Sequence, residues 1–318
     1  MHDAHYKLLV PMLLQRQVIP LLGAGANRCG RADSSSWREG LDLPDGHELA
    51  HYLAEQGKFP SDEAVDLVRV SQFIAVKLGS GALYDRLHEV FDHPFTPTPL
   101  HRFLAGLPAA RRARGLAPGH IVVTTNYDDS LERAFAEAGE PYDVVSYIAD
   151  GADAGRFMHR PHGAPAHVID VPNEYSGLAL ADRSVILKLH GAVDRADPMQ
   201  DSFVITEDDY IAYLTRTDIS GLLPVTLSAE LTRRHFLFLG YSLRDWNLRV
   251  ILHRIWGRQR RRYNSWAVQL RPDELDCAFW EERKVEIHDV ALDDYVAALA
   301  RELDAGTDDG PPALAAAS

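Results

Sequence analysis

The sequence predicts an α/β protein built on a doubly wound, mostly parallel β-sheet with an inserted helical module. Short apolar runs alternate with helical patterns along most of the chain. Polar, glycine-containing segments follow several of these runs directly, and the long stretch between the first two runs has a helical pattern throughout. The first two observations indicate parallel strands with a ligand site at their ends, and the third indicates the inserted module.

Six apolar runs are predicted as strands because each is short and is bounded by polar or glycine residues. They cover residues 18–22, 121–125, 185–189, 235–239, 265–269 and 284–287. Continuous apolar runs are typical of parallel strands that helices cover on both faces, so the sheet is expected to be Rossmann-like. Ligands of such sheets bind beyond the carboxyl ends of the strands. The residues that follow the runs are therefore the candidates for a site.

A helical module is expected at about residues 45–115, with helices at 45 or 46–56, 61–78, 81–91 and 99–107. Asp45 and Ser61 are predicted as N-caps, and Glu48 as the capping-box partner of Asp45. A second insertion, at about 149–183, is rich in Gly, Pro and His and is expected to be irregular. Both insertions would cover a cleft at the strand ends. One domain is expected over residues 1–303, followed by a disordered tail at 304–318.

Composition excludes several classes of function. The chain of 318 residues has a formal net charge of −13, which makes direct nucleic-acid binding an unexpected function. No apolar run approaches the ~20 residues that span a bilayer, and the first residues do not resemble a signal peptide, so we expect a cytoplasmic protein without membrane contact. The two cysteines, Cys29 and Cys277, form no CxxC pair, so no metal is expected.

Two motifs follow the first two predicted strands. The loop Gly23–Asn27 contains Gly-Ala-Gly, which lets a backbone approach a pyrophosphate closely at the start of a helix; a plain strand–helix turn is the alternative. The segment Thr124–Asp128 places two hydroxyls, an amide and a carboxylate at the end of a strand. Helix capping by Asn126 or Asp128 is the alternative there.

Two further motifs follow later strands. His190 and Gly191 come directly after an apolar run, which would direct the imidazole into the same cleft; a structural histidine is the alternative. The segment Phe238–Leu248 ends a strand at Gly240 and continues into a polar turn. Ser242 and the turn amides could bind a ribose or a phosphate, or the turn could be capped by Asp245 without any ligand.

The order of the four motifs resembles that of the sirtuin superfamily over roughly residues 15–290. The resemblance rests on Gly23-Ala24-Gly25, Thr125-Asn126-Tyr127-Asp128, His190-Gly191 and Gly240-Tyr241-Ser242-Leu243. The segments GYSLRDWNL and Ser202–Leu214 are most similar to the bacterial sirtuin-like NAD hydrolases of antiphage defence.

The resemblance implies an NAD glycohydrolase that cleaves the nicotinamide–ribose bond to nicotinamide and ADP-ribose, linear or cyclic, as the toxic effector of an antiphage system. Asn126 would hold the attacking water or the ribose hydroxyls, Asp128 would stabilise positive charge or bind the carboxamide, and His190, with a pKa near ~6.5, would accept a proton. No acid is needed, because nicotinamide leaves as a neutral base. The expected NAD-binding residues are Gly23, Ala24, Gly25, Asn27, Asp45, Thr125, Gly240 and Ser242, of which Gly23, Gly25 and Asn27 would hold the pyrophosphate and Ser242 the adenosine.

Three departures from the family pattern argue against protein deacylation. The four-cysteine zinc module is missing, Leu43–Gly46 lacks the Phe-Arg pair of the family's Pro-Asp-Phe-Arg segment, and Asn27 replaces the usual serine. An NAD-dependent deacylase is therefore a weaker alternative. A non-catalytic module that senses NAD or ADP-ribose is the alternative from another class.

Control of such an enzyme is expected to come from other chains. An unrestrained NAD hydrolase would poison its own cell, which predicts a homo-oligomer that is inactive at rest and a separate sensor or nucleic-acid-handling partner that activates it. Candidate contact surfaces are the apolar residues of Leu67–Phe91 and the side chains of Trp246, Ile251, Trp256 and Trp266.

Overall fold

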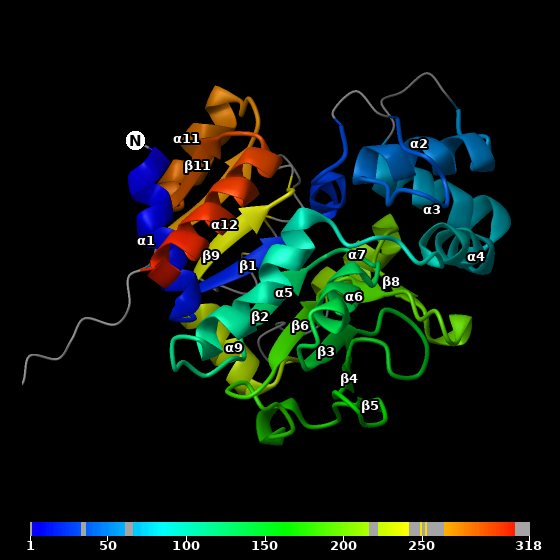
Figure 1. Cartoon of the computed structure of the whole chain (residues 1–318). Coiled ribbons are helices and arrows are strands. Elements are labelled where there is room, and N and C mark those ends of the chain that lie inside the picture. Colours follow the sequence, from blue (N-terminus) through cyan, green and yellow to red (C-terminus); the bar gives the residue numbers. More distant parts are fainter. Residues whose placement is uncertain are drawn as a thin grey trace, which may run out of the picture.

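The structure, a computed structural model, describes residues 2–32, 36–60, 66–215, 222–241, 249, 252 and 264–308. Within these residues, a nine-stranded sheet crosses the molecule in the order β11-β10-β9-β1-β2-β6-β3-β4-β5 (Figure 1). Its strands are β1 (Val18–Leu22), β2 (Ile121–Thr124), β3 (Tyr142–Tyr147), β4 (Phe157–Arg160), β5 (His167–Val168), β6 (Ser184–Lys188), β9 (His235–Leu239), β10 (Ser265–Gln269) and β11 (Val285–Asp289).

The strands from β11 to β3 are parallel, which confirms the α/β fold with a mostly parallel sheet and all six predicted strands. Strands β3, β4 and β5 were not predicted. β4 pairs antiparallel with both β3 and β5, so the insertion that was expected to be irregular instead extends the sheet as a hairpin. Its strands are short, and they are stabilised by the pairing of β4 with β3 and of β5 with β4 rather than by any long apolar run.

Helices cover both faces of the sheet, as alternating side chains in its strands require. In β1, Val18 and Leu22 pack in one cluster with α1 (His2–Leu14), α5 (Pro99–Arg112), α6 (Ser130–Glu137) and α12 (Leu292–Asp308). Ile19 and Leu21 pack in a second cluster with α7 (Glu207–Thr215), α9 (Val225–Arg233) and α11 (Glu274–Glu282). The short 3-10 turns η2 (Pro172–Glu174) and η3 (Pro198–Gln200) lie in the connections.

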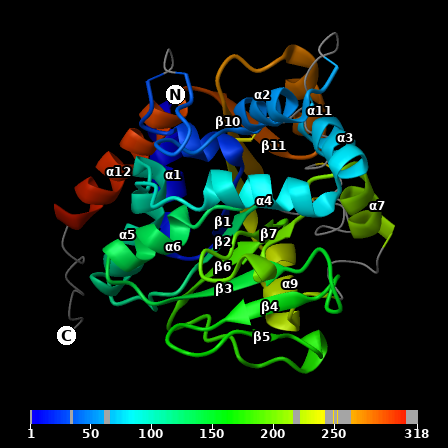
Figure 2. The ribbon, with the colours of Figure 1, turned by 90° about the vertical axis from the view of Figure 1, so that its right-hand side faces the viewer.

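The helical module lies over the ends of the strands (Figure 2). It consists of α2 (Gly46–Gly57), α3 (Leu67–Leu78) and α4 (Ser80–Phe91), which form a third apolar cluster with Tyr127 and with the β8 strand of a small sheet made of β7 (Gly191–Ala192) and β8 (Ser202–Phe203). The fourth helix that was expected in this module, α5, packs instead against the main sheet, because its buried leucines face α1 and α12.

Two predicted boundaries differ from the structure. Ser61 lies outside the described residues, and Asp66 caps α3 by accepting a hydrogen bond from the Arg69 amide. The tail was expected to begin at residue 304, but α12 continues to Asp308. Arg114 donates to the Leu303 carbonyl near the end of this helix. Residues 309–318 and most of the helix predicted at 245–256 lie outside the described part. No helix in the described part is long and apolar enough to cross a membrane.

Candidate active site

A cavity of about 770 Å³ lies between the strand ends and the helical module. Residues that follow six parallel strands line it, as expected for a doubly wound sheet. They include Gly25 after β1, Asn126 after β2, His190 after β6, Gly240 after β9, Gln269 at the end of β10, and Val290 after β11. The opposite wall is formed by the starts of α2 and α3 and the end of α4. The size lies within the range of small-molecule and cofactor sites.

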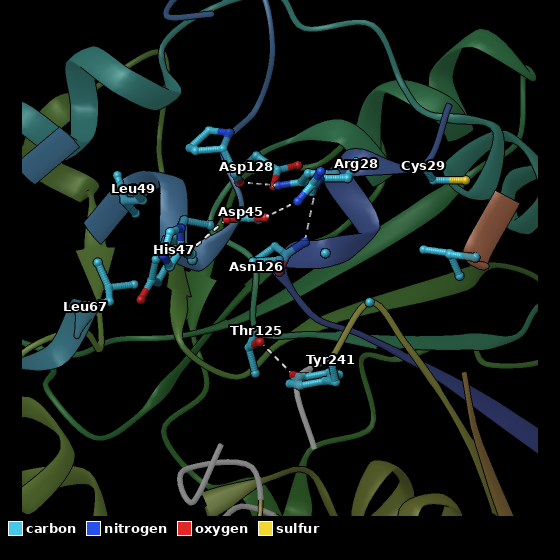
Figure 3. A pocket seen from close by; sticks show the side chains of 18 of the residues that line it. Arg28, Cys29, Asp45, His47, Leu49, Leu67, Thr125, Asn126, Asp128 and Tyr241 are labelled. Carbon is cyan, nitrogen blue, oxygen red and sulfur yellow. Dashed lines mark hydrogen bonds and ion pairs between the residues drawn. The ribbon is translucent and has the colours of Figure 1, made fainter. Parts of the chain in front are cut away.

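Among the described residues, the side-chain amide of Asn126 is hydrogen-bonded through its nitrogen and not through its oxygen (Figure 3). Its backbone amide donates to Thr124 Oγ1 at 3.0 Å, which forms the turn after β2. Its Nδ2 donates to the Gly23 carbonyl at 3.2 Å and to Asn27 Oδ1 at 3.4 Å. Among the described residues, Oδ1 of Asn126 has no partner. The side chain is 8% exposed and lines the cavity, so this oxygen is available to accept a hydrogen bond from a ligand.

Asp128 lines the same cavity, but both of its carboxylate oxygens are engaged. Oδ1 accepts from the backbone amide of Ser130 at 3.0 Å, at the start of α6, and Oδ2 accepts from Asn27 Nδ2 at 3.2 Å. The first contact is close to the capping role that the sequence left open as an alternative, although Asp129 and not Asp128 occupies the N-cap position of α6. A direct contact of Asp128 with substrate stays a prediction.

His190 is a neutral, buried imidazole in this structure. It is 5% exposed, and burial lowers its pKa to about 3, rather than leaving it near ~6.5 as expected from the sequence. Its Nδ1 lies 3.5 Å from the Tyr210 hydroxyl, and its Nε2 has no hydrogen-bond partner among the described residues. A neutral imidazole with an unused nitrogen can accept a hydrogen bond from a ligand in the cavity.

The glycine loop is shaped by contact with the end of β9. Gly23 and Gly25 donate to the carbonyls of Leu239 and Gly240 at 3.0 and 2.9 Å. A Cβ atom on either glycine would lie 2.8 Å from the Gly240 oxygen, and Gly240 itself has a φ of +70°. Close packing of two strand ends therefore explains these glycines without a ligand.

The loop also departs from its expected form. It continues into a single 3-10 turn, η1 (Ala24–Arg28), in place of a longer helix. Gly23 does not line the cavity, whereas Ala24, Gly25 and Asn27 do. The amide of Gly25 is already bonded to Gly240, so this donor is not directed at a phosphate.

Asp45 connects α2 to the glycine loop. Its carboxylate caps α2 by accepting from the amides of His47 and Glu48, and Glu48 completes the predicted capping box. Its Oδ2 also pairs with Arg28 Nη1 at 3.1 Å, as Figure 3 shows. Asp45 lines the cavity, yet its oxygens are occupied by the protein.

Sequence reasoning missed several residues of the cavity. Arg28 brings a positive charge to the loop, and Tyr241 binds the Thr125 hydroxyl at 2.6 Å. Gln269 has a buried Oε1 without a partner among the described residues. Two of them had a local signal: Arg28 directly follows the glycine loop, and Tyr241 belongs to the Gly240–Leu243 motif. Ser242, the expected adenosine contact, lies outside the described residues, and the described His, Cys, Asp and Glu side chains form no group that could hold a metal ion.

Comparison with known proteins assigns the chain to a family. A model of the SIR2-like domain matches residues 120–288, which is more than half of the chain. The chain belongs to the SIR2-like family. The matched part runs from the start of β2 into β11 and contains Asn126 and His190. The resemblance to the sirtuin superfamily is thus confirmed.

Curated relatives of this SIR2-like chain include named NAD hydrolases. The NAD(+) hydrolase ThsA of Acinetobacter baumannii (strain 532279) is 29% identical over 221 residues, or 68% of this chain and 37% of that protein. ThsA of Bacillus cereus (strain MSX-D12) is 25% identical over 262 residues, or 78% and 46%. Defense-associated sirtuin 2 of Bacillus subtilis is 24% identical over 284 residues, or 86% and 23%. The chain spans less than half the length of each of these three proteins.

Proposed function

We propose that this SIR2-like chain binds NAD in the cavity and hydrolyses the bond between nicotinamide and ribose, as an effector of antiphage defence. The observation that carries the proposal is a pair of side chains that line one cavity although they follow different strands, each with an atom that has no partner among the described residues. They are Asn126, of which only Nδ2 is bonded, and His190, whose Nε2 can accept a hydrogen bond when Nδ1 carries the proton. The names of the relatives, NAD(+) hydrolase and defense-associated sirtuin, support the same activity and setting.

The strand order supports an orientation for the dinucleotide. His190 follows β6 and Gln269 ends β10, four strand spacings apart, or roughly 19 Å. An extended dinucleotide suits that distance, with the nicotinamide ribose at Asn126 and His190. At the other end, Val268, Leu270 and Leu292 line the cavity together with the polar side chains of Gln269 and Asp293, a combination that suits an adenine base. Arg28 lies beside the glycine loop, where the pyrophosphate would pass.

The chemistry requires no acid at the leaving group. Nicotinamide departs with the electrons of the bond to C1′, and water adds to the resulting ribosyl cation. Asn126 Oδ1 would orient the water or a ribose hydroxyl. Neutral His190 would accept a hydrogen bond from the water; once the water has added to the ribosyl cation it is strongly acidic, so even an imidazole whose pKa is lowered to about 3 can relay its proton to solvent. The products are nicotinamide, ADP-ribose and one proton. Asn27 and Asp128 would hold the Asn126 amide in place.

The decisive experiment is incubation of the purified protein with NAD, followed by chromatography of nicotinamide, ADP-ribose and cyclic ADP-ribose. Equimolar nicotinamide and ADP-ribose, linear or cyclic, is the expected result. Tight NAD binding without any product, in an activated preparation, would instead identify a sensor module, and product formation only with an acetylated peptide would identify a deacylase.

We propose that activity is controlled through self-association and a separate sensor or nucleic-acid-handling partner. The sequence pointed to two surfaces. Trp266 is buried in the core and therefore lies on neither of these surfaces. Trp246, Ile251 and Trp256, the other residues of the second surface, lie outside the described residues. On α3, Val76 and Leu78 are exposed and remain candidates for contact. Light scattering at several concentrations, with turnover measured in parallel, tests the proposal; a fully active monomer would exclude it.

A further inference from the structure

Lys188, the last residue of β6, is a lysine buried in the core. It is 1% exposed. An ammonium group away from water is strongly unfavourable unless its hydrogens are bonded to protein acceptors. The position of this side chain therefore depends on the groups around it, and those groups belong to the candidate site.

The ammonium group has three acceptors. Nζ donates to the backbone carbonyl of Tyr127 at 3.3 Å, to the backbone carbonyl of Asp128, and to Glu132 Oε1 at 2.8 Å. Lysine has three hydrogens to donate, and each finds an oxygen here. Glu132, in the first turn of α6, supplies the opposite charge.

The two carbonyls place Lys188 between the groups of the proposed reaction. Tyr127 and Asp128 directly follow Asn126 in the turn after β2, and Lys188 ends β6 two residues before His190. The contact thus joins the turn that carries the amide to the strand that leads to the imidazole. The β2–β6 pairing ends at Thr124 and Lys188, and beyond it the Val193 amide donates to the Tyr127 carbonyl at 3.0 Å, so the Lys188 contacts add to one backbone link between the two segments.

We propose that Lys188 is a positioning residue: its ammonium group binds the Tyr127 and Asp128 carbonyls and thereby fixes the Asn126 amide relative to His190. This inference rests on the proposed NAD-cleaving function of the cavity. Lys188 is not among the residues that line the cavity. It acts on the orientation of Asn126 and contributes little to the binding of NAD.

The test compares Lys188→Met, which keeps length but has no donors, with Glu132→Gln, which keeps an acceptor oxygen for Lys188. Lys188→Met is expected to lower kcat for NAD by ~10-fold or more while KM and the Kd for ADP-ribose change less than ~3-fold. Glu132→Gln should keep kcat within ~3-fold, and Lys188→Arg should restore part of the lost rate because it retains donors.

Two further measurements separate positioning from folding and from the function itself. The double variant Lys188→Met with Glu132→Gln leaves no unpaired buried carboxylate and should still have the low kcat; a normal kcat in it would overturn the proposal. The side-chain amide NMR signal of Asn126, assigned by its absence in Asn126→Ala, should shift in Lys188→Met and stay in place in Glu132→Gln. If the signal does not move in Lys188→Met, the positioning role is overturned. If it moves but the wild-type protein never cleaves NAD, the positioning role stands and the proposed function is overturned.

Discussion

The polar side chains of the cavity form two groups. In the first group the hydrogen-bonding atoms are already bonded to other protein groups, and in the second group one atom is left without such a partner among the described residues. Asp128 and Asp45 have carboxylates whose oxygens hold a helix start and a neighbouring side chain. Asn126, His190 and Gln269 each keep one atom without a partner among the described residues. A ligand gains most from the second group. The atoms of His190 and Gln269 are buried, and a buried polar atom without a partner is costly until something binds it.

Asn126→Ala and His190→Ala should each lower NAD turnover by ~100-fold or more, which corresponds to ~2.7 kcal/mol of activation free energy. The reason is that each removes a group that the proposed mechanism places at the reacting ribose, while the fold keeps its core. The measurements are kcat and KM by chromatography and a melting curve for each variant. His162→Ala, an exposed histidine outside the cavity, is the matched control and should keep wild-type turnover.

A variant with near-normal turnover would remove its residue from the mechanism. The sequence could predict these two positions because each directly follows an apolar run. It could not predict Lys188 or Gln269 as parts of the site. The role of Lys188 depends on carbonyls 60 and 61 residues away in the chain, and that of Gln269 on the parallel alignment of β10 with its neighbours.

At the scale of elements, local pattern predicted the parallel strands and the capping box of α2, whereas contacts between distant segments decided the rest. Strand β3 contains Asp143, which is fully buried and bonded by Arg183 and by the amide of His162. A buried aspartate breaks an apolar pattern, and its partners come from later segments. For the glycine loop, the local pattern predicted a phosphate-binding loop. The structure explains Gly23 and Gly25 by their close packing on Gly240.

Gly240→Ala should destabilise the fold by at least ~2 kcal/mol. A Cβ there would lie 2.1 Å from the Ala26 amide nitrogen, and the φ of +70° is unfavourable for alanine. Gly106→Ala, in the middle of α5, is the matched control: nothing lies within 4 Å of its Cβ position, so it should stabilise the protein by ~0.5–1 kcal/mol. Urea denaturation of both variants measures the two free energies, and an unchanged Gly240→Ala would show that the loop does not pack on β9.

At the scale of the whole molecule, three buried histidines make stability depend on pH. Burial lowers the pKa of His190 and His120 to about 3 and that of His101 to about 4. In the unfolded chain each would titrate near ~6.5. The unfolded state therefore binds more protons below that pH, so the free energy of unfolding falls as the pH decreases from about 6.5. Burial raises the pKa of three acids, which opposes this loss because the folded state protonates them first: Glu132, Asp150 and Asp201.

Because the acids act in the opposite direction, the histidine contribution is best measured as a difference between variants. Each buried histidine contributes up to ~1.4 kcal/mol per pH unit to the slope below its unfolded pKa. His120→Asn removes one such group and keeps a hydrogen-bonding atom for the Ser184 hydroxyl, which lies 2.9 Å from His120 Nδ1. Denaturation of wild type and variant is measured at pH 7.5, 6.0 and 5.0. The free energy of unfolding should decline less steeply with decreasing pH in His120→Asn than in wild type, by about the contribution of one titrating histidine. Parallel curves for wild type and His120→Asn would mean that His120 is protonated in the folded protein as readily as in the unfolded chain.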